Sequence, residues 1–363
     1  MSNTESMSHS NQALLTVKVR AEHDYEILVG ADWRKYFSDL RGNHVKVLII
    51  APQFIVDTAE LKSYADNPQV VLFITPDAEA QKSADTLQAI WKVLGDNGFG
   101  RTDAIVAIGG GATTDLGGFA AATWMRGISW YAVPTTLAGM VDASIGGKTG
   151  INTETGKNLV GAFYSPRSVC IDLSWLTTLS DRDYAAGLAE VIKTGCIRDL
   201  EILNLLDRCQ TLSEAREVSG ELILRSATVK ADVVSNDFKE GKLREILNFG
   251  HTLGHAIEKL ADYQLRHGEA VSMGMAFALQ LSAVECGLSD GERVTTLLKK
   301  FGLPTTLDAN KYPWEALHAA MVGDKKSRDG RVRFIGLTAL GEPTWIESAG
   351  EDVLVASYER ICQ

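Results

Sequence analysis

Leu247-Asn248-Phe249-Gly250-His251-Thr252-Leu253-Gly254-His255 contains two of the seven histidines of this chain. Apolar residues recur at helical spacing from Leu253 onward, which predicts a helix from Asn248 to about Leu260. Residues four apart share a helix face, so His251 and His255 point the same way. His267 returns toward them from the loop after a short turn. Each histidine alone could be a helix-surface or capping residue, but three that converge favour a divalent metal site.

Length and charge limit the class of protein. With 363 residues, 45% of them hydrophobic, the chain is long enough for two domains with sizeable cores. The 36 basic and 46 acidic residues give a formal net charge of -10, which argues against a nucleic-acid-binding surface. This balance still allows a few lysines to gather in one pocket around an anionic small molecule.

Cysteine usage and hydropathy indicate a cytoplasmic protein. The five cysteines are odd in number and form no C-x-x-C motif, so we expect a reducing compartment without disulfides or thiolate zinc sites. Met1 to Gln12 is polar and predicts a disordered tail, not a signal peptide. The most apolar segment, Ala270 to Cys286, is too short to span a membrane comfortably and predicts a buried helix.

The order of predicted elements divides the chain in two. Before about Thr178, apolar runs at 14–19, 25–30, 45–50, 69–74, 104–108 and 129–133 predict strands, and 58–65, 78–97 and 113–125 predict helices. Strands that alternate with helices predict a parallel α/β sheet covered on both faces. Beyond it we expect helices at 181–195, 199–207, 213–235, 248–261, 270–286, 291–301 and 313–322, and strands only at 331–337 and 342–346. We therefore predict an α/β domain over 1–178 and a mainly helical domain over 179–363, with the active site in the cleft between them.

Gly109-Gly110-Gly111-Ala112-Thr113-Thr114-Asp115 lies between a predicted strand and a predicted helix. Glycines let the backbone approach a phosphate, and a helix N-terminus offers amide donors to it, so the run suits a pyrophosphate. The run is not a G-x-G-x-x-G fingerprint, and a tight turn without a ligand is the alternative. The stretch from Asp142 to Thr149 ends like a P-loop, but Asp142 stands where that motif requires glycine.

Glu190 and Lys193 stand three residues apart on a helix that is otherwise apolar. Such a pair is often a surface ion pair, but neighbours such as Leu188 and Ile192 predict burial. A buried carboxylate requires a partner, and a metal would supply one. One glutamate with two histidines leaves an open coordination position, as in catalytic zinc sites. Lys148 and Lys157 stand beside glycines, in stretches that we expect to be loops.

These motifs together resemble the 3-dehydroquinate synthase family of sugar-phosphate cyclases. The resemblance covers about residues 70–335 and depends on several separate strings. They are Gly109-Gly110-Gly111 with Asp115, Pro134 to Leu137, Val141 to Thr149, Gly156 to Phe163, Gly187 to Lys193, Asn248 to Glu258, His267-Gly268-Glu269 and Gly323-Asp324-Lys325-Lys326.

The resemblance implies a Rossmann-like NAD-binding domain, a helical domain with one divalent ion, and a lyase of the shikimate pathway for aromatic amino acid biosynthesis. The ion is usually zinc, with cobalt as an alternative. The implied substrate is 3-deoxy-D-arabino-heptulosonate 7-phosphate, and the products are 3-dehydroquinate and phosphate. The implied route is transient oxidation by NAD at C5, elimination of phosphate, reduction, ring opening and an intramolecular aldol closure. A homodimer is usual in this family.

The resemblance also assigns roles to individual residues. The implied metal ligands are Glu190, His251 and His267, which makes His255 a catalytic residue beside the metal and not a ligand. The other implied catalytic residues are Lys193, Asp142, Lys148, Arg244 and Asn248, and the implied substrate-binding residues are Arg126, Asn158, Lys230 and Lys325 of the Lys325-Lys326 pair. The implied cofactor contacts are Asp77, Glu79, Lys82, Gly111, Ala112, Thr113, Thr114, Asp115, Thr135, Thr136, Lys148, Lys157, Trp175, Leu176, Thr177 and Thr178.

One stretch departs from the family pattern. The family often carries an acidic residue for the adenosine ribose after the strand that ends near Ile50, and this chain has Ala51-Pro52-Gln53 there. The alternative functions are a cyclase of another sugar phosphate, a metal-dependent polyol or alcohol dehydrogenase, and a non-catalytic NAD or metal sensor. The many lysines argue against a dehydrogenase of a neutral polyol, which needs few cations.

Overall fold

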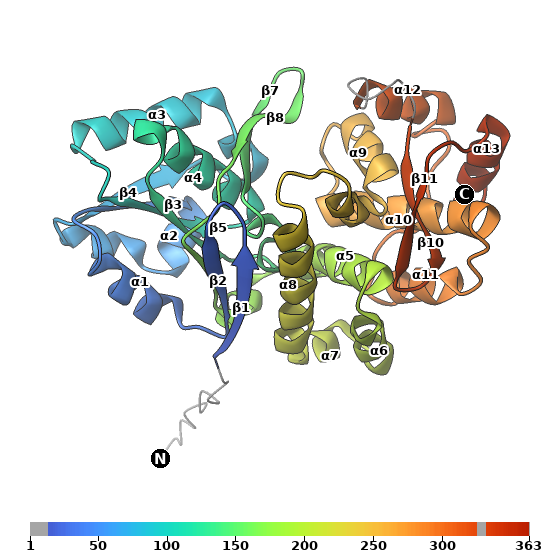
Figure 1. Cartoon of the computed structure of the whole chain (residues 1–363), viewed down its shortest axis with the longest axis horizontal. Helices are drawn as coiled ribbons and strands as arrows, with labels where there is room; N and C mark the ends of the chain where they lie inside the picture. The colour runs from blue at the N-terminus through green and yellow to red at the C-terminus, as the bar shows by residue number, and fades with distance from the viewer. Residues whose placement is uncertain (1–13, 325–331, 363) are drawn as a thin grey trace, which may run out of the picture.

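The first half of the chain is built on a seven-stranded sheet (Figure 1). The computed structural model describes residues 14–324 and 332–362. In spatial order the strands are β1 (Leu15–Arg20), β2 (Asp24–Val29), β9 (Ser168–Ile171), β6 (Ser129–Pro134), β5 (Ala104–Gly109), β3 (Val47–Pro52) and β4 (Val70–Thr75). Every neighbouring pair is parallel except β1 with β2. The carboxyl ends of the five parallel strands from β9 to β4 therefore meet at one edge of the sheet.

The central strands are short apolar runs because both faces of the sheet are covered. All residues of β5 are buried, as expected for a parallel strand between two layers of helices. Figure 1 shows α3 and α4 on one side of the sheet and α1 and α2 on the other. The helical segments of this half are α1 (Trp33–Arg41), α2 (Gln53–Thr58), η1 (Leu61–Asp66), η2 (Ala78–Gln81), α3 (Ala84–Asp96), α4 (Gly111–Thr123), η3 (Trp124–Arg126), the π-helix η4 (Gly139–Ala143) and η5 (Leu173–Thr178).

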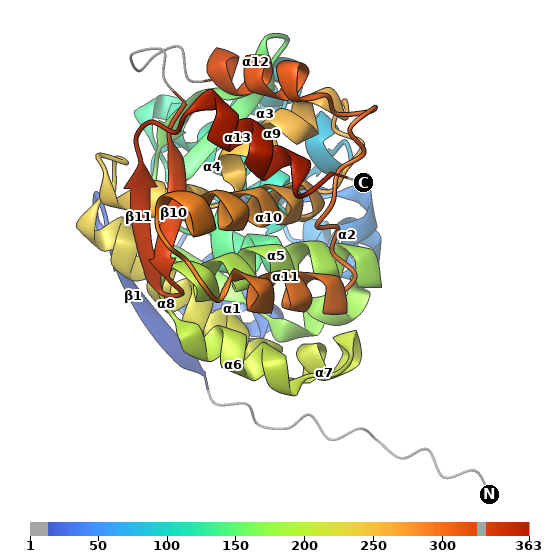
Figure 2. The ribbon, with the colours of Figure 1, turned by 90° about the vertical axis from the view of Figure 1, so that its right-hand side faces the viewer.

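The second half is mainly helical and is arranged around α10 (His267–Glu285). Between residues 270 and 282 of this helix, every residue is buried except Gln280, which is half-buried. It contacts α5, α9, α11, α13 and β10, and Figure 2 shows it in the middle of these elements. The other elements are α5 (Asp181–Ile197), α6 (Leu200–Arg208), α7 (Leu212–Glu217), α8 (Ser219–Asn236), η6 (Leu243–Asn248), α9 (His251–Leu260), α11 (Gly291–Lys300), α12 (Trp314–Asp324), β10 (Phe334–Ala339), β11 (Glu342–Ile346) and α13 (Glu351–Glu359).

The predicted fold class is confirmed: a parallel-sheet α/β half precedes a mostly helical half. Sequence periodicity did not predict α1, β9 or α13, nor the hairpin described below. Three predicted helices are divided: 78–97 into η2 and α3, 213–235 into α7 and α8, and 248–261 into the end of η6 and α9. The segment 58–65 contains the end of α2 and most of η1.

The expectation that Lys148 and Lys157 lie in loops is wrong. They stand on β7 (Lys148–Thr153) and β8 (Gly156–Phe163), which pair as an antiparallel hairpin. The hairpin escaped prediction because its glycines and exposed tip hide the alternation typical of a strand. It packs on α4 and projects from the first half of the molecule (Figure 1).

No helix within the described residues is long and apolar enough to cross a membrane. Most of the segment 270–286 is buried, as expected from its composition, but residues 283–285 at its end are exposed. The N-terminal segment expected to be disordered, Met1 to Gln12, lies outside the described residues.

Gly274→Ala should lower the free energy of unfolding by about 1–3 kcal/mol, because overpacking forces the backbone to move. The added Cβ would lie 1.9 Å from the carbonyl oxygen of Gly250 and would push α9 away from α10. Urea denaturation followed by circular dichroism measures the change. The matched control is Gly95→Ala in α3, where the nearest atom would be 3.6 Å away. A Gly274→Ala protein as stable as the wild type would contradict this close helix contact.

Candidate active site

Glu190, His251 and His267 lie together where three helices of the second half meet. Each offers one ligand atom, and these atoms all lie within 4.8 Å of one another. Oε1 of Glu190 is 3.5 Å from Nε2 of His251 and 3.4 Å from Nε2 of His267. Glu190 is on α5, His251 is the first residue of α9, and His267 is the first residue of α10. His267 was expected in a loop and instead begins a helix.

Glycines allow these helices to approach closely enough for the three side chains to meet. Gly250 has a φ of +79° immediately before α9, a conformation that side chains with a Cβ rarely adopt. A Cβ at Gly268 would lie 1.9 Å from the carbonyl oxygen of Ala186, so only glycine lets α10 begin against α5. The glycines around the histidines thus set the distances between the helices.

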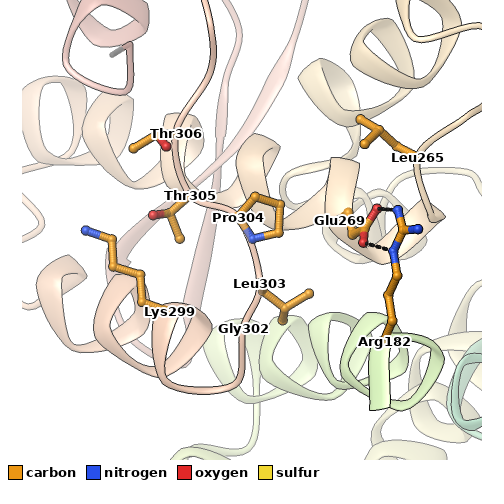
Figure 3. Close-up of a pocket in the computed structure, with 9 residues that line it drawn as sticks. All are labelled: Arg182, Leu265, Glu269, Lys299, Gly302, Leu303, Pro304, Thr305 and Thr306. Atoms are coloured by element: carbon orange, nitrogen blue, oxygen red, sulfur yellow. Dashed lines mark hydrogen bonds and ion pairs between the residues drawn. The ribbon is translucent and has the colours of Figure 1, made fainter. Parts of the chain in front are cut away.

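An ion pair fixes the start of α10 to α5. Nε and Nη2 of Arg182 donate to the two carboxylate oxygens of Glu269 at 2.6 and 2.8 Å (Figure 3). Glu269 also accepts a hydrogen bond from the backbone N–H of Arg266 at 3.0 Å. The pair lines a surface pocket of about 570 Å³ that contains none of the predicted site residues. Its contribution to the site is therefore to hold the helix end that carries His267.

The donor set has the charge and hydrogen bonding that a divalent cation requires. Both carboxylate oxygens of Glu190 are buried, and neither accepts a hydrogen bond of ordinary geometry, although Nζ of Lys193 lies 2.5 Å from Oε2. Burial would raise the pKa of Glu190, but the charge of Lys193 and the contacts with the two histidines hold it well below its usual value. An ionised, buried carboxylate that faces two imidazoles fits a metal site with one open position.

The two histidine ligands differ in protonation. Burial and the charge of Lys193 lower the pKa of His251 to about 3, so its ring is neutral, the form that binds metal. Burial would lower the pKa of His267 as well, but its contacts with the carboxylates of Glu190 and Glu258 raise it to about 10. A metal that binds His267 would therefore displace a proton.

His255 lies beside the cluster but outside the ligand group. Its ring centroid is 5.4 Å from that of His251 and 6.1 Å from that of His267. The residue is exposed, whereas His251 is buried. Helical spacing alone made His255 a ligand candidate, but this placement agrees with the role that the resemblance implies.

A second cluster of charges joins the two halves next to Lys193. Asp142 stands on the π-helix η4 of the first half, and its Oδ1 lies 2.5 Å from Nζ of Lys230 on α8. Burial would raise the pKa of Asp142, but Lys230 and Lys193 lower it, so the carboxylate is ionised. Burial lowers the pKa of Lys230 to about 8, although Asp142 opposes this shift. These cations offer charge for an anionic ligand close to the metal cluster.

Three more predicted site residues lie on this side of the site: Arg244, Lys148 and Asn248. Nη1 of Arg244 donates to the carbonyl oxygen of Gly146 at 3.1 Å, and its buried Nε has no hydrogen-bond partner among the described residues. Nζ of Lys148 lies 2.7 Å from Oε2 of Glu240, and Nδ2 of Asn248 donates to Oε1 of the same carboxylate at 3.4 Å. Glu240 is thus a site residue that the sequence reasoning missed.

Most predicted cofactor residues follow the carboxyl ends of the parallel strands. Gly111 to Asp115 open α4 after β5, and Thr135 and Thr136 follow β6. Asp77, Glu79 and Lys82 follow β4, and Trp175 to Thr178 belong to η5 after β9. A Cβ at Gly111 would lie 2.8 Å from that of Ala143, so the turn leaves no room for a larger residue there. The common edge brings these residues together, as expected for a nucleotide site on an α/β sheet.

Within this edge, Lys82 organises the polar side chains. It is buried, and its Nζ lies 2.7 Å from Oδ2 of Asp115 and 3.8 Å from Oε1 of Glu79. Nζ of Lys82 also donates to the side-chain oxygen of Asn158, which was predicted to bind substrate. Glu79 in turn accepts a hydrogen bond of 2.7 Å from Asn152 of β7.

The structure does not bring the predicted residue Arg126 to the site. Arg126 is exposed on η3 beyond the C-terminal end of α4, so the length of α4, roughly 20 Å at 1.5 Å per residue, separates it from the triple-glycine turn. Within one chain, Arg126 therefore lies away from the place beside the cluster where it was predicted to contact substrate. Lys325, with Lys326, lies outside the described residues.

Glu258 is the second residue of the site that the sequence reasoning missed. Its Oε2 lies 3.1 Å from Nδ1 of His267, and its Oε1 lies 3.3 Å from Nζ of Lys157. A signal existed in the sequence, because Glu258 stands seven residues after His251 and so lies on the same helix face.

Comparison with known proteins agrees with this geometry. A family model described as 3-dehydroquinate synthase N-terminal matches residues 72–186, and one described as 3-dehydroquinate synthase C-terminal matches residues 187–327. A 3-dehydroquinate synthase of Streptomyces avermitilis is 48% identical over 93% of this chain and 94% of its own. One of Mycobacterium leprae is 46% identical over 95% of this chain and 97% of its own.

Solved structures share the architecture along nearly the whole chain. The 2-epi-5-epi-valiolone synthase of Streptomyces hygroscopicus subsp. jinggangensis, with NAD+ and Zn2+ bound, has a TM-score of 0.86 at 25% identity and covers 95% of this chain and 98% of its own. A 2-deoxy-scyllo-inosose synthase has a TM-score of 0.84 at 24% identity over 96% of this chain and 99% of its own. An iron-containing alcohol dehydrogenase has a TM-score of 0.62 at 16% identity over 93% of this chain and 98% of its own, so the fold alone does not distinguish cyclases from dehydrogenases.

Glu190→Gln should empty the metal site, because a neutral amide replaces the one anionic ligand and leaves Lys193 buried beside it without its carboxylate. Elemental analysis after loading with zinc and dialysis measures the bound metal. Glu201→Gln, which removes a partly exposed carboxylate paired with Arg208 on α6, is the control and should retain stoichiometric metal. Stoichiometric zinc in the Glu190→Gln protein would exclude Glu190 as a ligand.

Proposed function

The chain belongs to the 3-dehydroquinate synthase family, and we propose that the cluster of Glu190, His251 and His267 is the metal centre at which it performs this family's reaction. The reaction converts 3-deoxy-D-arabino-heptulosonate 7-phosphate to 3-dehydroquinate and phosphate, so the protein is an NAD- and metal-dependent lyase. The observation that supports this assignment most directly is the buried, ionised carboxylate of Glu190 between two imidazoles, with the cations Lys193 and Lys230 beside it.

The metal would be held by one carboxylate and two imidazoles. Zinc suits this donor set, since it binds oxygen and nitrogen ligands and keeps an open position in catalytic sites. When bound, such an ion supplies a Lewis acid that stabilises negative charge on a substrate hydroxyl oxygen. Lys193 beside Glu190 would then meet the anionic part of the substrate.

NAD would lie along the carboxyl edge of the sheet. The N-terminus of α4 at Gly111 would receive the pyrophosphate, and Thr135, Thr136 and the η5 turn would border the nicotinamide side. Bound NAD supplies a reversible hydride acceptor that is restored in each cycle. Because Ala51, Pro52 and Gln53 offer no carboxylate after β3, we expect the adenosine ribose to be held by the segment around Asp77 and Glu79.

The chain's own residues would bind the substrate and move its protons. Lys148, Asn158, Lys230, Arg244 and Asn248 would hold the phosphate and carboxylate, whose concentrated negative charge requires several cations. Asp142 would keep Lys230 and Lys193 in place from the opposite half. A ring nitrogen of His255 would exchange a proton with the C5 hydroxyl oxygen, since an imidazole can accept and return a proton near neutral pH.

The remaining assignments concern the whole molecule. Residues 1–178 would bind the cofactor, and residues 179–363 would bind the metal and most of the substrate, with catalysis between them. We expect a homodimer in the cytoplasm that acts on a small-molecule sugar phosphate and binds neither nucleic acid nor membrane. The polyol dehydrogenase alternative is not favoured, because the family models and the synthase relatives cover most of the chain.

Incubation with the heptulosonate phosphate and catalytic NAD should release phosphate without net accumulation of NADH, because the hydride returns to the product. A phosphate assay measures the released phosphate, and absorbance at ~340 nm measures NADH in the same reaction. Treatment with a chelator should abolish phosphate release, and added zinc should restore it. Stoichiometric NADH with a polyol, or phosphate release that a chelator leaves unchanged, would contradict the proposed function.

A further inference from the structure

Glu258 on α9 contacts the metal site, yet the proposed reaction gives it no role. Its side chain is 6% exposed, and its two oxygens serve different partners. Oε2 lies 3.1 Å from Nδ1 of His267 on α10, and Oε1 lies 3.3 Å from Nζ of Lys157 on β8. One buried carboxylate therefore joins a metal ligand to a strand of the other half of the molecule.

The contact with His267 determines which ring nitrogen can bind metal. Nε2 of His267 lies 3.4 Å from Oε1 of Glu190, on the side of the ring opposite Glu258. A ligand imidazole that donates its N–H to a carboxylate through Nδ1 presents the lone pair of Nε2 to the metal, and its ring is fixed in orientation. His267 needs such support, because 41% of its side chain is exposed, whereas His251 is enclosed by its neighbours.

The contact with Lys157 reaches the half that carries the cofactor residues. Nζ of Lys157 also lies 3.9 Å above the ring of Tyr263, in the turn between α9 and α10, and this cation–π contact adds to the ion pair. Lys157 stands on the β7–β8 hairpin, which packs on α4, the helix that opens at the triple-glycine turn. A change in the position of Glu258 would therefore affect the β7–β8 hairpin, which packs against the helix that opens at the predicted nucleotide site.

We propose that Glu258 is a positioning residue that fixes His267 for coordination through Nε2 and, through Lys157, couples the β7–β8 hairpin to the metal centre. This inference rests on the proposed metal centre. Metal bound to His267 fixes the ring, the ring fixes the Glu258 carboxylate, and the ordered carboxylate holds Lys157. Since coupling between binding events is reciprocal, anything that draws Lys157 away from Glu258 also loosens the support of His267.

The first test measures metal affinity and ligand geometry without any turnover. Glu258→Gln keeps the shape of the side chain but loses its charge, and it should weaken zinc binding on the order of 10- to 100-fold in competition with a chelating dye. The visible absorption of the cobalt-loaded protein, which reports the ligand geometry, should also change. Glu79→Gln is the matched control: Glu79 also contacts the hairpin, through Asn152 at 2.7 Å, but it touches neither ligand histidine. It should bind zinc and cobalt as the wild type does.

The second test separates the hairpin from the metal ligand. Zinc should slow amide hydrogen exchange in residues 148–163 of the wild type, and this protection should disappear in Glu258→Gln. Lys157→Met, which keeps the length of the side chain but not its charge, should also lose the protection, and its zinc affinity should fall less than that of Glu258→Gln, because the carboxylate still contacts His267. Glu258→Asp, which keeps the charge but shortens the side chain, should show an intermediate zinc affinity even if the glutamine variant folds poorly.

The outcomes distinguish this inference from the proposed function. A wild-type chain that binds no divalent metal would overturn the metal centre and this inference with it. If the wild type binds zinc, and Glu258→Gln and Glu258→Asp both bind it with the same affinity as the wild type, the metal centre would stand and the positioning role would be overturned. Zinc-dependent protection of the hairpin that persists in Glu258→Gln or Lys157→Met would overturn the coupling.

Discussion

The carboxylate of Glu190 is ionised although only 2% of its side chain is exposed, and this fold must place a cation and polar partners around it. Burial of an uncompensated carboxylate is too costly for a stable protein, so Lys193, His251 and His267 all converge on it. The requirement extends to the backbone, because α5, α9 and α10 approach closely only where Gly250, Gly268 and Gly274 leave room. The buried carboxylate of Glu190 thus has two effects: it fixes how the three helices pack, and it gives the second half a site for a divalent cation.

The two halves meet through polar contacts and not only through the apolar core. Lys230 of α8 pairs with Asp142 of η4, and Lys157 of β8 pairs with Glu258 of α9. Both pairs lie next to the metal cluster and to elements that follow the carboxyl edge of the sheet. A ligand that spans the two halves would therefore contact charged side chains that are held in place by residues of both halves. This arrangement suits a reaction that needs a cofactor in one half and a metal in the other.

Sequence periodicity predicted the strands of the seven-stranded sheet except β9, and most helices, because apolar runs and helical spacing follow directly from burial. It also predicted the burial of Glu190 from its apolar neighbours. It did not predict the β7–β8 hairpin, whose exposed tip lacks a buried face, nor the helical start at His267. Local spacing made His255 a ligand candidate, whereas the resemblance implied His267 in its place, and the packing of α10 against α5 groups His267 with Glu190 and His251. Glu240 and Glu258 were missed because their partners, Lys148 and His267, are brought to them by tertiary contacts, and the separation of Arg126 from the cluster follows from the length of α4.

X-ray absorption at the zinc edge of the metal-loaded protein tests the central claim most directly, since it reports the atoms that bind the ion. The account predicts two imidazole nitrogens at about 2.0–2.1 Å, carboxylate oxygen at a similar distance, and no sulfur. The imidazole signal should fall by half in His267→Ala and stay unchanged in His255→Ala. A sulfur ligand, a third imidazole, or an unchanged spectrum in His267→Ala would contradict the convergence of Glu190, His251 and His267 on one cation.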